Sequence, residues 1–217
     1  MNHGLLHQAL RSREGRLGFT LLGGLGLLSV AVAFGWVATG WDQSLAEQWS
    51  GPSLAHWFGT NRLGQDVLDR ALVGLVTAFV VGGAVTLGSV FLGALLGGVA
   101  GWRMGGLVDE ALQYLMGVID SVPVYLLAVA LAFSLGGGET AIVLAMVLSF
   151  WTATARLVRA EVARLREREF VLSARAIGLP GWTILRRHLL PNTLHILLVQ
   201  GTLTFVAAIK TEVILSF

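Results

Sequence analysis

The stretch RLVRAEVARLREREFVLSARAIGLPGWTILRRHLLPN, residues 156–192, decides the fold class of this chain. It carries eight of the fifteen Lys and Arg residues and lies between hydrophobic segments that are each long enough to cross a bilayer. Small residues at Ser173, Ala174 and Ala176 lead to Gly178 and a nearby proline, which predicts a short helix with a defined stop. Because small side chains let a helix approach another protein closely, the stretch predicts a docking element on the cytoplasmic side of a membrane protein.

The composition supports the same class. Hydrophobic residues make up 55% of the chain and charged residues 13%, and the mean hydropathy is +0.74, whereas about a quarter of a soluble domain is charged. The absence of Cys excludes a disulfide framework and a thiolate metal site. The sequence pI of about 9.7 would also suit nucleic-acid binding, but the basic residues cluster where the positive-inside rule places them. We therefore predict an all-α integral membrane protein with no nucleic-acid partner.

Five segments are apolar over the roughly 20 residues that a membrane-spanning helix needs. The first follows a basic N-terminal tail, and we interpret it as a retained anchor because its apolar run is too long for a cleaved signal peptide. The third is interrupted by Pro123. The predicted spans are 17–39, 71–101, 107–133, 140–157 and 193–213.

The arginines predict the orientation of these spans. With the N-terminus in the cytoplasm, twelve arginines lie on that side and only Arg62 and Arg70 on the other. Five spans then leave the C-terminus outside, where the chain stops at Phe217 without a polar tail, so we expect it to be truncated there. The predicted domains are a cytoplasmic N-tail with its anchor helix (1–40), an extracytoplasmic segment (41–70) and a helical core (71–217) with a cytoplasmic docking loop (156–191).

Two features inside the predicted spans concern packing and mechanism. Small residues recur every four positions in the second span, a small-xxx-small pattern that predicts close helix packing in lipid. In the third span, Asp120 precedes Pro123 by three residues, and an ionisable group at membrane depth faces a bundle interior or a wet cavity. Two interpretations are open for Asp120 and Pro123: they line a translocation path, or they make structural hydrogen bonds. The predicted packing residues are Ser89, Gly93, Gly97 and Gly101.

We recognise no catalytic or metal-binding motif. The histidines have no metal-ligand spacing on one predicted face, and neither a Gly-rich phosphate loop nor a plausible nucleophile–base pair is present. We therefore expect that the chain itself is not an enzyme and binds no cofactor or metal. The histidines concerned are His3, His7, His56, His188 and His195.

Three segments resemble one known family, the dipeptide/oligopeptide/nickel permeases of ABC importers. HWFGTNRLGQDVLDRALVG (56–74) resembles the family's outer-face signature H-x-x-G-T-D-x-x-G-R-D-V-L-S-R, although Asn61, Gln65 and Asp69 depart from the usual Asp, Arg and Ser. The ending AIKTEVILSF is similar to the start of the family's T-E-x-x-L-S-F-L-G-L-G segment, which leads there into one more membrane helix.

The third segment, FVLSARAIG…RRHLLPN, is similar to the family's ATPase-docking loop, the EAA motif. Leu172 replaces the Glu that names the motif, and His188 replaces its Ile. Ala174, Gly178, Leu190 and Pro191 stand at the motif's own positions. The docking residues that the resemblance implies are Glu169, Leu172, Ser173, Ala174, Ala176, Gly178, Leu190 and Pro191.

The resemblance implies a second, C-type permease subunit of a bacterial or archaeal inner membrane, with an anchor helix before a five-helix type I importer core. Its implied partners are a homologous permease, two ATPase subunits that bind ATP and Mg, an extracytoplasmic substrate-binding protein and membrane lipid. Di- or oligopeptides are the implied cargo, with nickel chelates or other small solutes as alternatives. Family members often carry Arg and Asp near Tyr114 and Gly117, so a scaffold or degenerate subunit that docks an ATPase without transport is the alternative class.

We also expect the docking loop to transmit rigid-body motion to the spans on either side, 141–157 and 193–213. Arg156 and Arg159 extend the fourth span into the cytoplasm, and we expect them to pair with Glu161 or with lipid phosphate.

Overall fold

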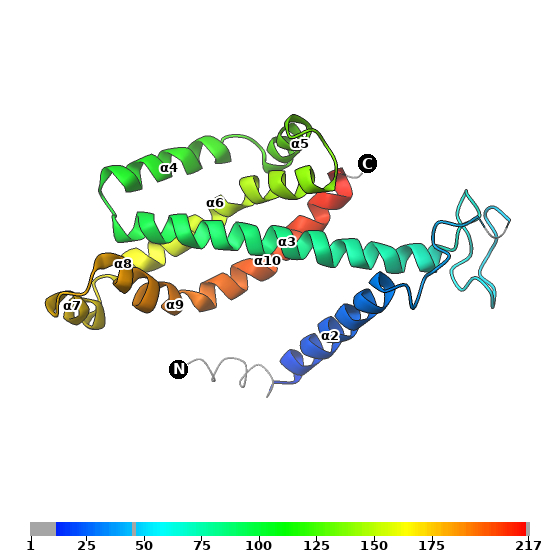
Figure 1. Cartoon of the computed structure of the whole chain (residues 1–217), viewed down its shortest axis with the longest axis horizontal. Coiled ribbons are helices and arrows are strands. Elements are labelled where there is room, and N and C mark those ends of the chain that lie inside the picture. The colour runs from blue at the N-terminus through cyan, green and yellow to red at the C-terminus, as the bar shows by residue number, and fades with distance from the viewer. Residues whose placement is uncertain (1–11, 45–46, 216–217) are drawn as a thin grey trace. The chain divides into compact units, whose positions relative to one another are not determined.

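The computed structural model describes residues 12–44 and 47–215, which form helices joined by turns and by one irregular segment, described at 34–44 and 47–66 (Figure 1). The predicted features at Arg11, His3 and His7 and the ending Ser216-Phe217 lie outside the described residues. The chain divides into two compact units, one up to Val80 and one from Val81 onward. Within the described residues the only β-structure is an isolated bridge between Thr60 and Asp66, so the prediction of an all-α protein is confirmed.

The first unit contains helix α2 (Arg13–Ala33), the irregular segment and the first turns of helix α3 (Val67–Trp102). Ser12 caps α2, because its side-chain oxygen accepts a hydrogen bond from the Gly15 N–H at 2.9 Å. At about 1.5 Å per residue, the 21 residues of α2 match the roughly 30 Å hydrocarbon core of a bilayer. Leucines along α2 are exposed, as expected of a helix that faces lipid.

In the second unit, the remainder of α3 is followed by α4 (Leu107–Asp120), α5 (Val124–Ser134), α6 (Glu139–Leu165) and α10 (Leu194–Leu215). Helix α6 is the centre of this unit, because α4, α5 and α10 all pack against it. Half of its most apolar window is buried, a larger share than in the other candidate spans of the described residues. Small and β-branched residues dominate its buried face, which brings its neighbours close.

The described part of the chain has four helices long and apolar enough to cross a membrane, namely α2, α3, α6 and α10. Helices α4 and α5 together count as a fifth, but they are bent by 93°. The expected third span at 107–133 is therefore a broken helix pair. Pro123 explains the break, because its ring lacks an N–H and excludes the preceding Val122 from helical geometry.

The small residues of α3 lie against α6. Ser89, Gly93, Gly97 and Gly101 are all buried, and a Cβ added at Gly93 would lie 2.7 Å from the backbone oxygen of Trp151. Side chains at these glycines would meet backbone, which cannot move aside. The two helix backbones are therefore in direct contact along this stripe.

Residues after α6 form a folded cluster of short helices at one end of the second unit (Figure 1). The cluster comprises α7 (Glu169–Ala176), α8 (Gly181–Ile184), a π-helical turn η1 (Leu185–Leu189) and α9 (Leu190–Asn192). Gly178 ends α7 with a φ of +82°, and the Leu179 N–H bonds back to the Ala174 carbonyl at 3.1 Å. A shared apolar core holds the cluster together: Val158, Val162, Leu165, Val171, Ala174, Ile184, Leu185 and Leu189.

Candidate functional site

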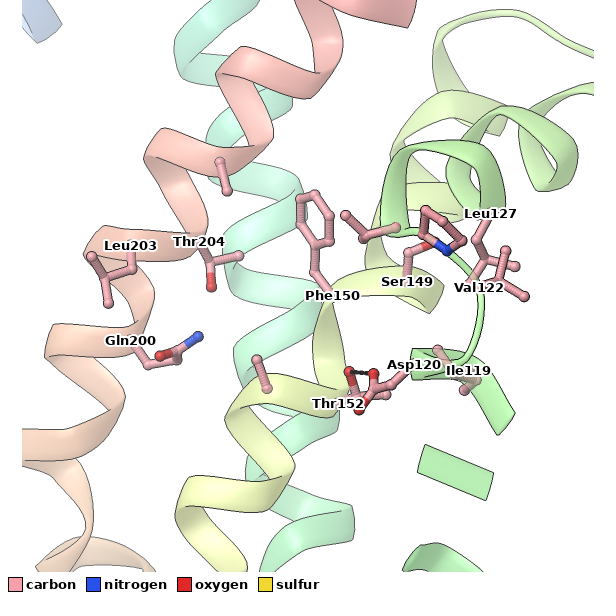
Figure 2. A pocket seen from close by; sticks show the side chains of 14 residues that line it. Ile119, Asp120, Val122, Leu127, Ser149, Phe150, Thr152, Gln200, Leu203 and Thr204 are labelled. Carbon is pink, nitrogen blue, oxygen red and sulfur yellow. Dashed lines mark hydrogen bonds between the residues drawn. The ribbon is translucent and has the colours of Figure 1, made fainter. Parts of the chain in front are cut away.

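A cavity of about 440 Å³ lies within the second unit, between the α4–α5 bend, α6 and α10 (Figure 2). Its apolar wall includes Val122, Leu127, Phe150 and Leu203. Polar side chains reach it from three helices: Asp120, Ser149, Thr152, Gln200 and Thr204. An apolar cavity with a few convergent polar groups is the usual form of a small-molecule site.

Asp120 joins α4 to α6 at the edge of this cavity. Its Oδ1 accepts a hydrogen bond from the Thr152 hydroxyl at 2.7 Å, and its Oδ2 accepts two from Arg156, at 3.0 Å from Nε and 2.7 Å from Nη2. The side chains of Asp120 and Arg156 are 39% and 50% exposed. The carboxylate thus makes the hydrogen bonds of the structural interpretation and also lines the cavity. Pro123 lines the same cavity.

A second, buried ion pair connects the same two helices. Arg159 donates from Nε to Asp109 Oδ1 at 2.5 Å and from Nη2 to Oδ2 at 2.8 Å, and the Gly105 N–H donates to the same Oδ2 at 3.0 Å. The expected pairing of Arg156 and Arg159 with Glu161 is therefore wrong, because Glu161 instead bonds Arg164 at the next turn of α6.

Sequence reasoning missed Asp109, although a signal for it exists. Asp109 and Asp120 lie about three helical turns apart on α4, so their side chains project from the same face. That face carries both acids toward the arginines of α6. Tyr114 and Gly117, near which family members often carry Arg and Asp, are both exposed, and Asp120 lies one turn beyond Gly117.

Gln200 and Thr204 were also missed. Both point into the cavity from α10 (Figure 2), and their four-residue spacing places them on one helix face. Thr204 is only 4% exposed. A polar pair at this spacing in an apolar span is a signal that the sequence does carry.

The predicted docking residues divide into two groups. Ala174 is buried in the core of the cluster, and Leu190 packs against it and against Gly98 of α3. These two residues hold the loop together instead of facing outward, because Ala174 falls on the inner side of α7. The remaining docking residues are exposed: Glu169, Leu172, Ser173, Ala176, Gly178 and Pro191.

Two exposed apolar residues extend this outer face beyond the predicted set. Phe170 precedes Leu172 by two residues and Ile177 follows it by five, and Ile177 is 77% exposed at the end of α7. Sequence reasoning did not include them because it weighed small side chains above apolar ones. We call Phe170, Leu172, Ser173, Ile177 and Gly178 the docking face, after the role that the sequence predicts for this loop.

In the first unit, the segment that resembles the outer-face signature is a compact hydrogen-bonded turn. Asn61 Nδ2 donates to Gln65 Oε1 at 2.9 Å, and Arg70 donates to the same oxygen at 2.6 Å. The two amides thus pair with each other at the positions where the family signature has Asp and Arg. Asn61 Oδ1 also accepts from the backbone N–H of Gln65 at 3.0 Å, which closes the turn.

Asp66 closes the same turn and caps α3. Its Oδ2 lies 2.8 Å from His56 Nδ1, and its Oδ1 accepts from the N–H groups of Leu68 and Asp69 at 2.7 and 3.2 Å. Burial raises the pKa of the Asp66 carboxyl, but the bond to His56 and the two backbone bonds outweigh burial, so its pKa lies below its ordinary value. This carboxylate therefore stays ionised and keeps the start of α3 fixed.

The apolar helices, the polar cavity between them and the cluster of short helices between α6 and α10 define a multi-pass, all-α membrane protein. Comparison with known proteins then places it more closely. The chain belongs to the family of binding-protein-dependent transport system inner membrane components, whose model matches residues 89–217.

Several relatives are transport permeases. The chain is 38% identical over 175 residues to the dipeptide transport system permease protein DppC of Bacillus subtilis, covering 81% of this chain and 54% of that protein. It is 35% identical over 166 residues to the oligopeptide transport system permease protein OppC of the same organism, covering 76% and 54%. It is 33% identical over 202 residues to the glutathione transport system permease protein GsiD of Pectobacterium atrosepticum, covering 88% and 65%. The chain thus spans about half the length of the first two relatives.

Proposed function

We propose that this chain is a transmembrane permease subunit of an ATP-driven, binding-protein-dependent importer of di- or oligopeptides. The observation that carries the proposal is the docking face on a folded loop between α6 and α10, in a chain whose relatives include dipeptide and oligopeptide permeases. Nickel chelates or other small solutes are the alternative cargo. A relative named for glutathione transport favours a peptide-like cargo over a metal chelate.

The proposed partners are a homologous permease subunit, two ATPase subunits and an extracytoplasmic binding protein. ATP and Mg belong to the ATPase subunits, so we expect hydrolysis there and no catalytic role for this chain. Seating of α7 in an ATPase groove would move α6 and α10 as rigid bodies, because the loop that carries α7 shares an apolar core with the end of α6. The cavity beside Asp120 and Pro123 is the proposed part of the translocation path that this subunit contributes.

We propose a cytoplasmic N-terminus and docking loop, with the 41–66 segment outside. Single cysteines in this Cys-free chain at Ser44 and Ser173, both exposed, test the orientation with an impermeant maleimide in intact cells. We expect labelling at Ser44→Cys and none at Ser173→Cys until the membrane is permeabilised. The opposite pattern would reverse the topology.

The functional experiment introduces Gly178→Arg into the assembled complex. Gly178 lies on the docking face with a φ of +82°, and its Cβ position is open for at least 4 Å around, so the Arg side chain would project at the partner. We expect loss of co-purified ATPase and a fall in peptide import to background. The matched control is Gly105→Arg, because Gly105 has a φ of +81°, equally open surroundings and a place outside the docking loop. The control shares the backbone strain and the added charge, and it should retain the ATPase.

Asp120→Asn separates transport from docking in the same assay. An asparagine cannot give Arg156 two charge-assisted bonds, and it removes the negative charge from the wall of the cavity, whereas the exposed pair itself adds only about 0–1 kcal/mol to stability. We expect import about tenfold lower with the ATPase fully retained.

Normal ATPase retention in Gly178→Arg would show that the 156–191 loop is not the site where the ATPase binds. A wild-type complex that binds ATPase but imports no peptide would instead favour the scaffold.

A further inference from the structure

Trp102 is the last residue of α3, and the docking loop contacts its side chain from two separate points. The guanidinium carbon of Arg175, near the end of α7, lies 4.4 Å from the centroid of the indole ring. This is within the range of a cation–π interaction, which attracts a cation to the face of an aromatic ring. The end of α7 is therefore joined directly to the end of α3.

The second contact is with Gly181, the first residue of α8. A Cβ added there would lie 3.0 Å from the indole Nε1 and 3.1 Å from Cζ2. The φ of Gly181 is not in the left-handed region, so backbone conformation does not require glycine here, but a Cβ would force the indole to move by a few tenths of an ångström. The indole thus lies directly on the backbone where α8 begins.

The backbone around Trp102 is anchored as well. Its carbonyl accepts a long hydrogen bond from Arg166 Nη1 at 3.5 Å, just after α6 ends. One residue earlier, a Cβ on Gly101 would lie 2.5 Å from the Arg159 carbonyl oxygen. Trp102 also packs on the apolar core of the cluster. The end of α3 is thus fixed to α6, α7 and α8 together.

We propose that Trp102 is a positioning residue that couples the docking loop to α3. Resting on the proposed function, this means that a displacement of α7 by an ATPase moves α3 together with α6. The loop also reaches α3 where Leu190 packs on Gly98, and the contacts at Trp102 add a direct connection from α7 and the start of α8 to the end of α3. Through the contacts with Arg175 and Gly181, α3 would move together with α6 and α10, because a shift of α7 and α8 also displaces the indole of Trp102.

The first test measures import per ATP hydrolysed in the reconstituted complex of the full chain with its partners. Trp102→Leu keeps apolar bulk but removes the aromatic face, and Arg175→Gln removes the cation. We expect each to lower this ratio at least fivefold while ATPase retention stays unchanged. Trp102→Phe and Arg175→Lys keep a ring and a cation, and they should recover at least half of the wild-type ratio. Arg103→Gln, which removes the neighbouring exposed charge, is the control and should match wild type.

A second test uses the contact with Gly181. Gly181→Ala should lower the coupling ratio because its Cβ displaces the indole, and Trp102→Phe in the same chain should restore it, since phenylalanine is smaller. If Gly181→Ala lowers the coupling ratio equally in chains with Trp102 and in chains with Trp102→Phe, the proposal is overturned. Wild-type coupling in Trp102→Leu would also overturn it. The proposed function is judged separately by the wild-type complex, which must import peptide.

Hydrogen exchange on the purified chain adds a readout that needs no partner. If Trp102 holds the loop, Trp102→Leu should speed exchange in α7 and at the start of α8 at least tenfold, and leave α5 unchanged. Unchanged exchange in α7 would overturn the proposed role of Trp102, even in a preparation with no transport. Faster exchange across the whole second unit would show that Trp102 is needed for general stability, and would likewise reject a specific coupling role.

Discussion

Gly97→Ala is expected to lower the free energy of unfolding of the helical core by about 3 kcal/mol, the upper end of the usual cost of overpacking. The added Cβ would lie 2.8 Å from Cα and 2.9 Å from the carbonyl carbon of Ala155, and closer still to its backbone oxygen. Because the obstacle is backbone of α6, no change of rotamer relieves it. The two helices must separate along the stripe.

The matched control is Gly83→Ala, in the same helix. No atom lies within 4 Å of a Cβ at Gly83, and alanine is the better helix former by about 1 kcal/mol. Gly83→Ala should therefore unfold no earlier than wild type. The measurement is a denaturant titration of the purified chain in detergent, followed by helical circular dichroism. Equal midpoints for the two variants would mean that the close contact at Gly97 does not limit packing.

The contrast between these glycines shows what the sequence could predict. Four-residue spacing identified a packing stripe on α3, because small residues in register leave a groove whichever helix fills it. The same spacing does not name α6 as the partner, since that depends on the path of the intervening chain. Similarly, Pro123 predicted an interruption, but the 93° bend follows from how α4 and α5 each pack on α6.

For the docking loop, the sequence predicted the local feature, the end of the short helix, but not the tertiary contacts of its side chains. The stop at Gly178 follows from a local preference for glycine in left-handed backbone, and the structure has it there. Burial of Ala174 and exposure of Ile177 depend on the apolar core that α7 and η1 share with α6. The contact of Arg175 with Trp102 joins residues far apart in sequence, so no periodicity could reveal it.

The ion pairs between α4 and α6 were missed for a related reason. A charge in a sequence has several potential partners within reach, and Arg159 was expected to pair with the nearby Glu161 or with lipid phosphate. The structure selects Asp109 because the close approach of the helices brings it within 2.5 Å of the guanidinium. A carboxylate that is almost fully buried needs such a partner, and burial was not visible from the sequence.

Asp109→Ala is expected to destabilise the core by about 3–5 kcal/mol, the usual cost of removing one partner of a buried ion pair. The side chains of Asp109 and Arg159 are only 2% and 18% exposed, so the guanidinium would keep its charge with little access to water. The Gly105 N–H would lose its acceptor as well. Asp109→Asn keeps an oxygen for that N–H and should fall between Asp109→Ala and wild type.

The more exposed pair on the same two helices provides the control. Asp120 and Arg156 make a similar two-bond contact with side chains 39% and 50% exposed, and an exposed pair contributes about 0–1 kcal/mol. Asp120→Ala should therefore cost far less than Asp109→Ala in the same denaturant titration. The double variant Asp109→Ala/Arg159→Met removes both charges and should recover part of the loss, because no unpaired charge remains buried. If Asp109→Ala and Asp120→Ala cost the same, or if the double variant is as unstable as the sum of its parts, burial of the Arg159 charge is not what makes Asp109 essential to the core.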